Sequence, residues 1–120
     1  MATLEKHAID APDETRHFKA HGHVDVVTLG DFTIGKEIFE PGWQWSNDVK
    51  PIAGTEMCMV HHTGVCISGH MTIHHQDGTE LAVGPGDVFD LQPGHDAWVD
   101  GSEPCVMWDT GVKPYAKPAG

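Results

Sequence analysis

Glycine and proline recur along this chain at intervals too short to hold a long helix. Between them lie short runs rich in β-branched and aromatic residues, at residues 24–29, 32–40, 57–62, 65–68, 71–75, 81–83, 88–91, 97–99 and 106–109. Many short strands at regular spacing are typical of a β-sandwich or β-barrel. The chain is therefore predicted to be all-β.

The Asp77-Gly78 step predicts a tight hairpin turn, because both residues tolerate a positive φ. This turn would join a strand that ends at His75 to one that begins near Glu80. Residues 1–23 are charged and lack period-two alternation, so we expect an irregular N-terminal arm. Residues 24–111 would form the barrel. Residues 112–120 contain prolines that prevent ladder pairing, which predicts a loosely held tail.

Composition narrows the class of protein. The chain has 120 residues, of which 39% are hydrophobic and 21% charged, as in one soluble globular domain. Its formal net charge of −11 repels phosphate backbones and anionic lipids, so nucleic acid and membranes are not expected partners. No run approaches the roughly 18 apolar residues of a membrane span, and the N-terminus lacks a secretory apolar segment. These features predict a cytoplasmic protein, in which the three cysteines are free thiols.

The segment at residues 84–98, GPGDVFDLQPGHDAW, resembles the second signature of the cupins. That signature runs glycine, five residues, proline, one residue, glycine, two residues, histidine. Gly86 and Gly94 fit it, whereas Gln92 stands in the proline slot and Ala97 in the histidine slot. The last metal ligand of the family pattern is therefore absent from its usual position.

The first cupin signature has a histidine pair one residue apart, then a glutamate three or four residues on, then six residues and a glycine. Counting back from Gly69 puts His62 in the glutamate slot, Cys58 in the second histidine slot and Glu56 in the first. The resemblance covers residues 39–109 and is carried by glycine spacings that recur in order.

This resemblance implies a double-stranded β-helix, the jelly-roll cupin barrel, often paired as a homodimer. Many cupins hold an iron, manganese, nickel, zinc or copper ion inside the barrel, and others hold none. Their activities include dioxygenation, isomerisation, decarboxylation, lyase reactions and plain ligand binding. The fold alone therefore leaves the function open.

A divalent metal site is predicted at the mouth of the barrel. Side chains alternate along a strand, so Glu56, Cys58 and His62 would share one face, and His95 would enter from a neighbouring loop. We predict all four as metal ligands, with Glu56 and His62 also catalytic. Two imidazoles and a carboxylate suit Fe, Mn or Ni, while the thiol shifts the preference towards Zn or Fe.

A metal-free domain is the alternative, because the family's usual residues are missing from all four ligand slots. His62 would then be a buried imidazole bonded to the main chain, Cys58 a small core residue and His95 a turn residue. The sequence thus leaves two hypotheses. One is a metal-dependent oxidoreductase, isomerase or lyase acting on a small organic molecule, and the other is a metal-free binding or regulatory domain.

Tryptophan and histidine side chains are the candidates for the ligand pocket. Trp45 and Trp98 are predicted to line it, because indole rings suit an apolar or ring-shaped ligand. His75 is predicted to line it because it is in phase with Met71 and Ile73 on its strand. Trp108 is predicted to pack in the core or in a dimer contact.

Overall fold

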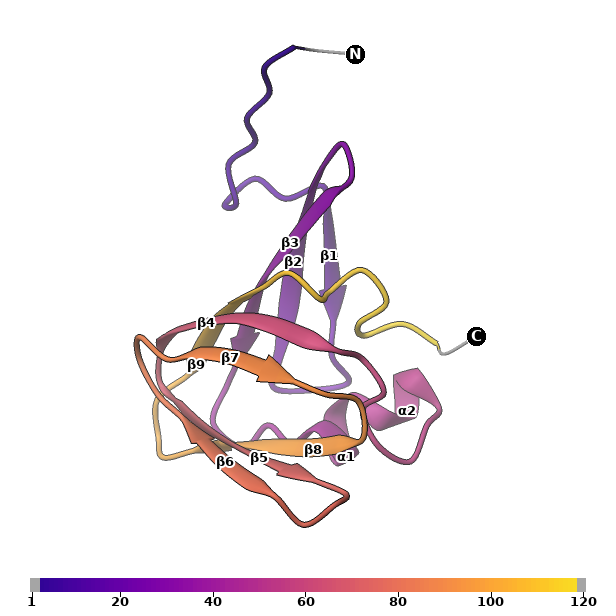
Figure 1. Cartoon of the computed structure of the whole chain (residues 1–120), viewed down its shortest axis with the longest axis vertical. Coiled ribbons are helices and arrows are strands. Elements are labelled where there is room, and N and C mark those ends of the chain that lie inside the picture. Colours follow the sequence, from indigo (N-terminus) through magenta and orange to yellow (C-terminus); the bar gives the residue numbers. More distant parts are fainter. Residues whose placement is uncertain (1–2, 119–120) are drawn as a thin grey trace.

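Two antiparallel β-sheets form the framework of the computed structural model, which describes residues 3–118 (Figure 1). The larger sheet has the strand order β1 (Glu14–His17), β2 (Gly22–Leu29), β3 (Phe32–Phe39), β9 (Cys105–Asp109), β4 (His62–Ser68), β7 (Val88–Leu91). The smaller sheet has the order β6 (Glu80–Val83), β5 (His70–His75), β8 (His95–Asp100). Two short helices, α1 (Trp45–Asp48) and α2 (Lys50–Ala53), lie at one end of the barrel. The all-β prediction is confirmed.

The core lies between the two sheets, because every second side chain of the strands points inward. Phe39, Met107 and Phe89 face it from the larger sheet, and Met71 and Ile73 from the smaller one. The three cysteines are free, as predicted, and all three are buried.

The predicted hairpin at Asp77-Gly78 is confirmed. β5 ends at His75 and β6 begins at Glu80, as the sequence indicated. Gly78 has a φ of 94°, which favours glycine, and its N–H donates to the carbonyl of His75 at 2.9 Å.

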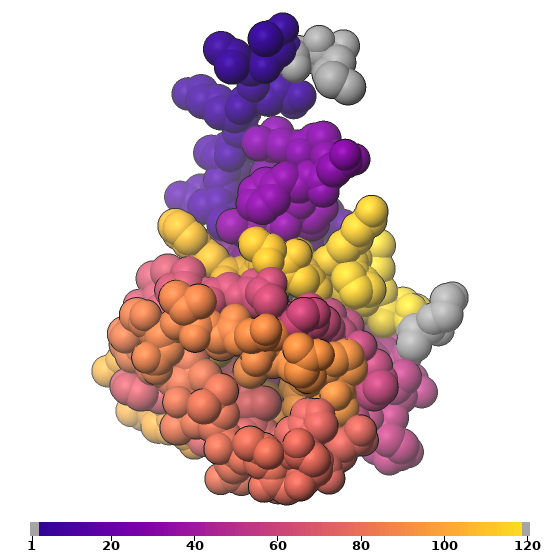
Figure 2. Space-filling model, in the orientation of Figure 1, coloured from indigo at the N-terminus to yellow at the C-terminus, as the bar shows by residue number. Residues whose placement is uncertain are grey.

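Both predicted chain ends are more ordered than expected. β1 and the first residues of β2 fall inside the predicted irregular arm, so that prediction is wrong from Glu14 onward. β1 is an edge strand with exposed side chains on both faces, which explains why it shows no alternation. Residues 1–2 and 119–120, the outer ends of the predicted arm and tail, lie outside the described residues. Figure 2 shows the first described residues standing away from the barrel at one end of the molecule.

The tail prediction is also wrong, because Val112 and Tyr115 are buried. The guanidinium of Arg16, on β1, donates hydrogen bonds of 2.7 Å to the carbonyl oxygens of both residues. The C-terminal segment is therefore fixed against the larger sheet rather than loosely held (Figure 1).

The segment before β4 differs from the predicted strand at residues 57–62. The chain there follows helices α1 and α2 as a loop, and the ladder starts only at His62. Strand alternation therefore does not govern residues 56–61. Between residues 3 and 118, no helix is long and apolar enough to cross a membrane.

Candidate metal centre

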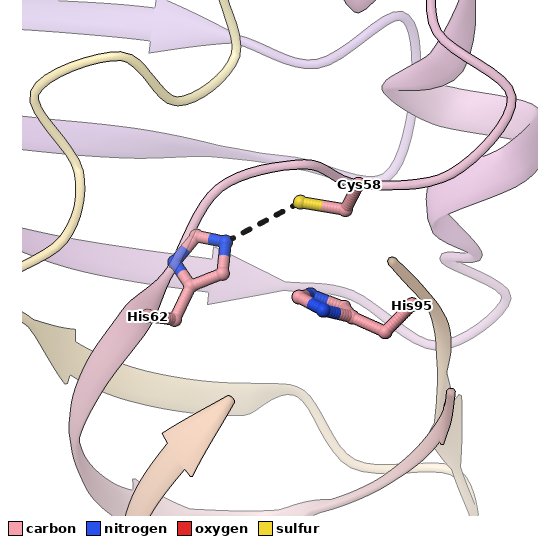
Figure 3. Close-up of side chains that lie close together, drawn as sticks. All are labelled: Cys58, His62 and His95. Atoms are coloured by element: carbon pink, nitrogen blue, oxygen red, sulfur yellow. Dashed lines mark hydrogen bonds between the residues drawn. The ribbon is translucent and has the colours of Figure 1, made fainter. Parts of the chain in front are cut away.

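Three ligand-type side chains converge inside the barrel (Figure 3). Cys58 Sγ lies 3.5 Å from His62 Nε2, and one ligand atom from each of Cys58, His62 and His95 lies within 4.8 Å of the others. All three residues are buried. The sequence predicted these three residues together, and the structure places them together.

The main chain sets the spacing of this cluster. His62 is the first residue of β4 and His95 the first residue of β8. Cys58 lies in the loop before β4, where its N–H donates to the carbonyl of His95 at 2.8 Å. The N–H of Gly94 donates to the carbonyl of Cys58 at 2.7 Å. The two segments that carry Cys58 and His95 are thus joined backbone to backbone.

A hydrogen bond at Nδ1 fixes the orientation of both imidazole rings. The Nδ1 of His62 is hydrogen-bonded to the buried carboxylate of Asp109, on the neighbouring strand β9. The Nδ1 of His95 lies 2.7 Å from the carbonyl oxygen of Gln92. With both Nδ1 atoms bonded to acceptors, each ring has its Nε2 left for another partner.

Charge accumulates in this buried cluster. Burial alone would raise the pKa of the Cys58 thiol, but hydrogen bonds with His62 and His95 lower it to about 6. Burial opposes the charge on His62 as well, yet its bonds to Asp109 and Cys58 raise its pKa well above the ordinary value. Burial likewise opposes ionisation of Asp109, but the bond from His62 lowers its pKa. These shifts favour the thiolate form of Cys58, the protonated form of His62 and the carboxylate form of Asp109, which lie in a row.

Glu37 and Tyr115 complete the cavity, and sequence analysis missed both, together with Asp109. Burial, reinforced by the neighbouring Asp109, raises the pKa of Glu37 well above its usual range and so favours the protonated carboxyl. Burial also raises the pKa of Tyr115, whose ring meets the ring of His62 edge-on with centroids 4.7 Å apart. Glu37 and Asp109 do carry one signal: a carboxylate in phase with the apolar positions of a strand.

Glu56 is not part of the cluster, so the prediction that it faces the barrel is wrong. Its side chain is 92% exposed and accepts a hydrogen bond of 3.0 Å from the Lys50 amine. The prediction assumed strand alternation in a segment that is a loop.

The three residues predicted to line the ligand pocket lie in different places. Trp45, on α1, is buried and lines the cavity that contains the cluster. His75 lines a different pocket, next to His95, and its Nε2 bonds to the carbonyl of Pro93 at 2.9 Å. Trp98 points to the opposite face of β8 from Ala97, which does line the cavity, so the prediction for Trp98 is wrong.

The central cavity is small. Its volume is about 30 Å³, and a buried water needs roughly 10–15 Å³, so the cavity has space for about two waters or one ion. Two larger pockets of about 360 Å³ and 290 Å³ adjoin it. The first shares Trp45, Cys58 and Tyr115 with the cavity.

Solved structures resemble this chain over most of its length. A sugar phosphate isomerase from a cupin superfamily, from Silicibacter pomeroyi, matches with a TM-score of 0.62 and 16% identity, over 88% of this chain and 73% of that one. A conserved protein with a double-stranded β-helix domain, from Klebsiella pneumoniae, matches with a TM-score of 0.57 and 20% identity, over 90% and 91%. The chain has the cupin fold.

A third structure, a protein of unknown function from Rhizobium leguminosarum, matches with a TM-score of 0.58 and 19% identity, over 91% of this chain and 97% of that one. No family model matches the sequence, and no curated protein matches it. At these identities the likeness establishes the cupin fold and leaves the chemistry to the residues of the site.

The cupin ligand slots can now be placed in this chain. The slots of Cys58, His62 and Ala97 all line the cavity, which supports the alignment made from the glycine spacings. His95 lies two residues before Ala97 on β8, and its side chain points to the same side. His95, two residues from the usual slot, thus reaches the same cavity. Glu56, in the remaining slot, lies in solvent instead.

Proposed function

We propose that this cupin-fold protein binds one divalent transition-metal ion at Cys58, His62 and His95 and acts on a small organic molecule beside it. The observation that carries this proposal is the bonding of the two imidazoles. Metal-ligating histidines almost always donate the other ring N–H to a carboxylate, a carbonyl or water. Here Asp109 and the carbonyl of Gln92 supply those acceptors.

The charges of the cluster also fit a divalent ion. The pKa shifts favour a thiolate at Cys58 and a carboxylate at Asp109, and an imidazolium at His62 would offset only one of those two negative charges. A divalent ion held by neutral imidazoles would balance both. One thiolate and two imidazoles favour zinc among the candidate ions.

Three protein ligands leave a coordination position open, where a bound ion would act as a Lewis acid on water or on a substrate oxygen. Glu37 is the residue suited to hold a proton beside that position, because burial raises its pKa and its Oε2 has no hydrogen-bond partner among residues 3–118. Tyr115 closes the cavity against bulk water.

A phosphorylated sugar is not the substrate that this site favours, although one structural neighbour is named a sugar phosphate isomerase. A phosphate group is usually held by several cationic or N–H donors. The cavity and the two pockets beside it are lined by a single lysine, Lys117, and by no arginine among the described residues.

Metal content of the purified protein tests the proposal. Wild type expressed with added zinc should hold one ion per chain, and Cys58→Ser, His62→Ala and His95→Ala should each lose it. Glu56→Gln is the matched control, because that side chain lies in solvent, and it should keep the ion. Wild type without a bound ion, or loss of the ion in Glu56→Gln, would contradict the assignment.

A second candidate is a metal-free thiol nucleophile, favoured by the order Cys58, His62, Asp109. This order places a thiolate beside an imidazole that a carboxylate orients, which is the arrangement of a nucleophile, its base and its positioning group. His95 separates the two candidates. His95→Ala should abolish metal binding, whereas thiol catalysis would survive chelation of every metal and retain its dependence on Asp109.

A further inference from the structure

The central cavity cannot hold an organic molecule together with an ion, because its volume is about 30 Å³. An organic ligand must therefore bind in an adjoining pocket. Of the two large pockets beside the cavity, one lies towards Cys58 and the other towards His95. We call the first the tail pocket, lined by Trp45, Val49, Ala53, Val60, Pro114 and Tyr115 among others, and the second the loop pocket, lined by His75, Asp77, Asp90, Gln92 and His95 among others.

The tail pocket has the character of a ligand site. Its volume of about 360 Å³ falls in the range of small-molecule pockets, and most of its lining side chains are apolar. The Thr55 hydroxyl, one of its few polar groups, already donates to the carbonyl of Met57 at 2.8 Å. Among residues 3–118, Lys117 is the one charged side chain that lines it.

The loop pocket differs in chemistry. Asp77 and Asp90 both line it, which disfavours anionic ligands. Both ring nitrogens of His75 are already engaged, by the carbonyl of Pro93 and by the N–H of Asp77. The imidazole of His75 is thus hydrogen-bonded to the loops around the pocket and is not left for a ligand.

The wall between the tail pocket and the cavity consists of residues common to both: Trp45, Cys58 and Tyr115. Cys58 belongs to the candidate metal centre, and Tyr115 packs against His62. A ligand in the tail pocket would therefore lie directly against the cluster.

The pocket is already formed, because its tail side is tied down. Arg16 holds the carbonyls of Val112 and Tyr115, and the N–H of Tyr115 donates to the carbonyl of Val112 at 2.8 Å. The wall supplied by the C-terminal segment is thus fixed by charge-assisted hydrogen bonds to β1.

We infer that the tail pocket binds the organic ligand of this protein, a small molecule with an apolar body and at most one negative charge, and presents it to the cluster at Cys58. The inference rests on the proposed function for the identity of the reacting site. The binding step itself does not need a metal ion.

Fluorescence titration of the metal-free protein with anilinonaphthalene sulfonate, an apolar probe with one negative charge, tests the binding step. Ala53→Trp should fill the pocket and weaken probe binding by at least about tenfold, from lost apolar contact. Leu81→Trp, in the loop pocket, is the matched control and should bind as wild type does. Met59→Asp is a second variant at a position 55% exposed, so it keeps the fold while adding a repelling charge at the rim.

Alkylation of Cys58 tests the connection to the cluster. Bound probe should slow its modification by iodoacetamide at least about tenfold, read by peptide mass mapping, because the probe covers the wall that contains this residue. Probe binding that is weaker in Leu81→Trp but unchanged in Ala53→Trp would overturn the pocket assignment. Binding without protection of Cys58 would overturn the connection. Neither result changes the metal content of the protein, so failure here and failure of the proposed function are distinguishable.

Discussion

Asp109→Asn removes one charge from the barrel while nearly keeping the shape of the side chain. In the native protein one carboxylate oxygen bonds His62 Nδ1 and the other accepts from the N–H of Gly111 at 2.7 Å. Asparagine has one acceptor oxygen and one NH₂ group, so it cannot accept from both. The variant should lose about 1–3 kcal/mol of unfolding free energy for the buried donor left without a partner.

The effect on metal affinity follows from the same bond. Loss of a partner behind a metal-ligating histidine typically weakens binding by about 10–100-fold, which is roughly 1.4–2.8 kcal/mol. The energy of the bond gives a similar value, because a charge-assisted hydrogen bond exceeds a neutral one by about 1–1.5 kcal/mol. We therefore expect Asp109→Asn to bind zinc at least about tenfold more weakly than wild type.

Competition with a chromophoric chelator measures this affinity, and thermal unfolding shows that the variant is folded at the assay temperature. Asp90→Asn is the matched control, because Asp90 forms the same kind of pair with His61 on the surface. Equal affinity in Asp109→Asn and wild type, or an equal loss in Asp90→Asn, would refute the reasoning that Asp109 supports a metal ligand.

Three further predictions concern the thiol, the tail and the sheet. The ultraviolet absorbance of the Cys58 thiolate in metal-free protein should fall as the pH drops through about 6, and it should be absent in Cys58→Ser. A titration midpoint near 9.0, the ordinary pKa of a cysteine thiol, would contradict this. Because its pKa is lowered by folding, the stability that Cys58 contributes is complete above pH 9.0 and is lost as the pH falls through about 6. Arg16→Ala should lower the unfolding free energy by about 3 kcal/mol or more, through two lost charge-assisted bonds, and an unchanged melting temperature would contradict it. Gly64→Ala should cost about 3 kcal/mol or prevent folding, because its Cβ would lie 2.0 Å from the Trp108 carbonyl oxygen; a stable variant in chemical denaturation would refute that packing.

The fold was predictable because the residues at each glycine turn are enough to determine its backbone conformation. The Asp77-Gly78 hairpin and the spacing of Gly86 and Gly94 depend on backbone conformations that neighbouring residues decide, and both identify strand ends correctly. β1 was not predictable, because an edge strand exposed on both faces carries no hydrophobic alternation.

The candidate site was predictable in part. Cys58, His62 and His95 were found from ligand chemistry and family spacing. Glu56 was misplaced because a strand pattern was extended into a loop. Asp109 was missed because its role depends on the pairing of β4 with β9, which brings it to His62 from 47 positions away in the chain.

Backbone hydrogen bonds between Cys58 and His95 fix the spacing of the two main-chain positions from which these candidate ligands extend. A substitution at either position therefore leaves the main-chain position of that residue unchanged. His95→Cys would convert a site with one sulfur into a site with two, and the reciprocal change Cys58→His would remove sulfur entirely. The selectivity of such a centre among soft and hard ions can thus shift by single substitutions, without any rearrangement of the barrel.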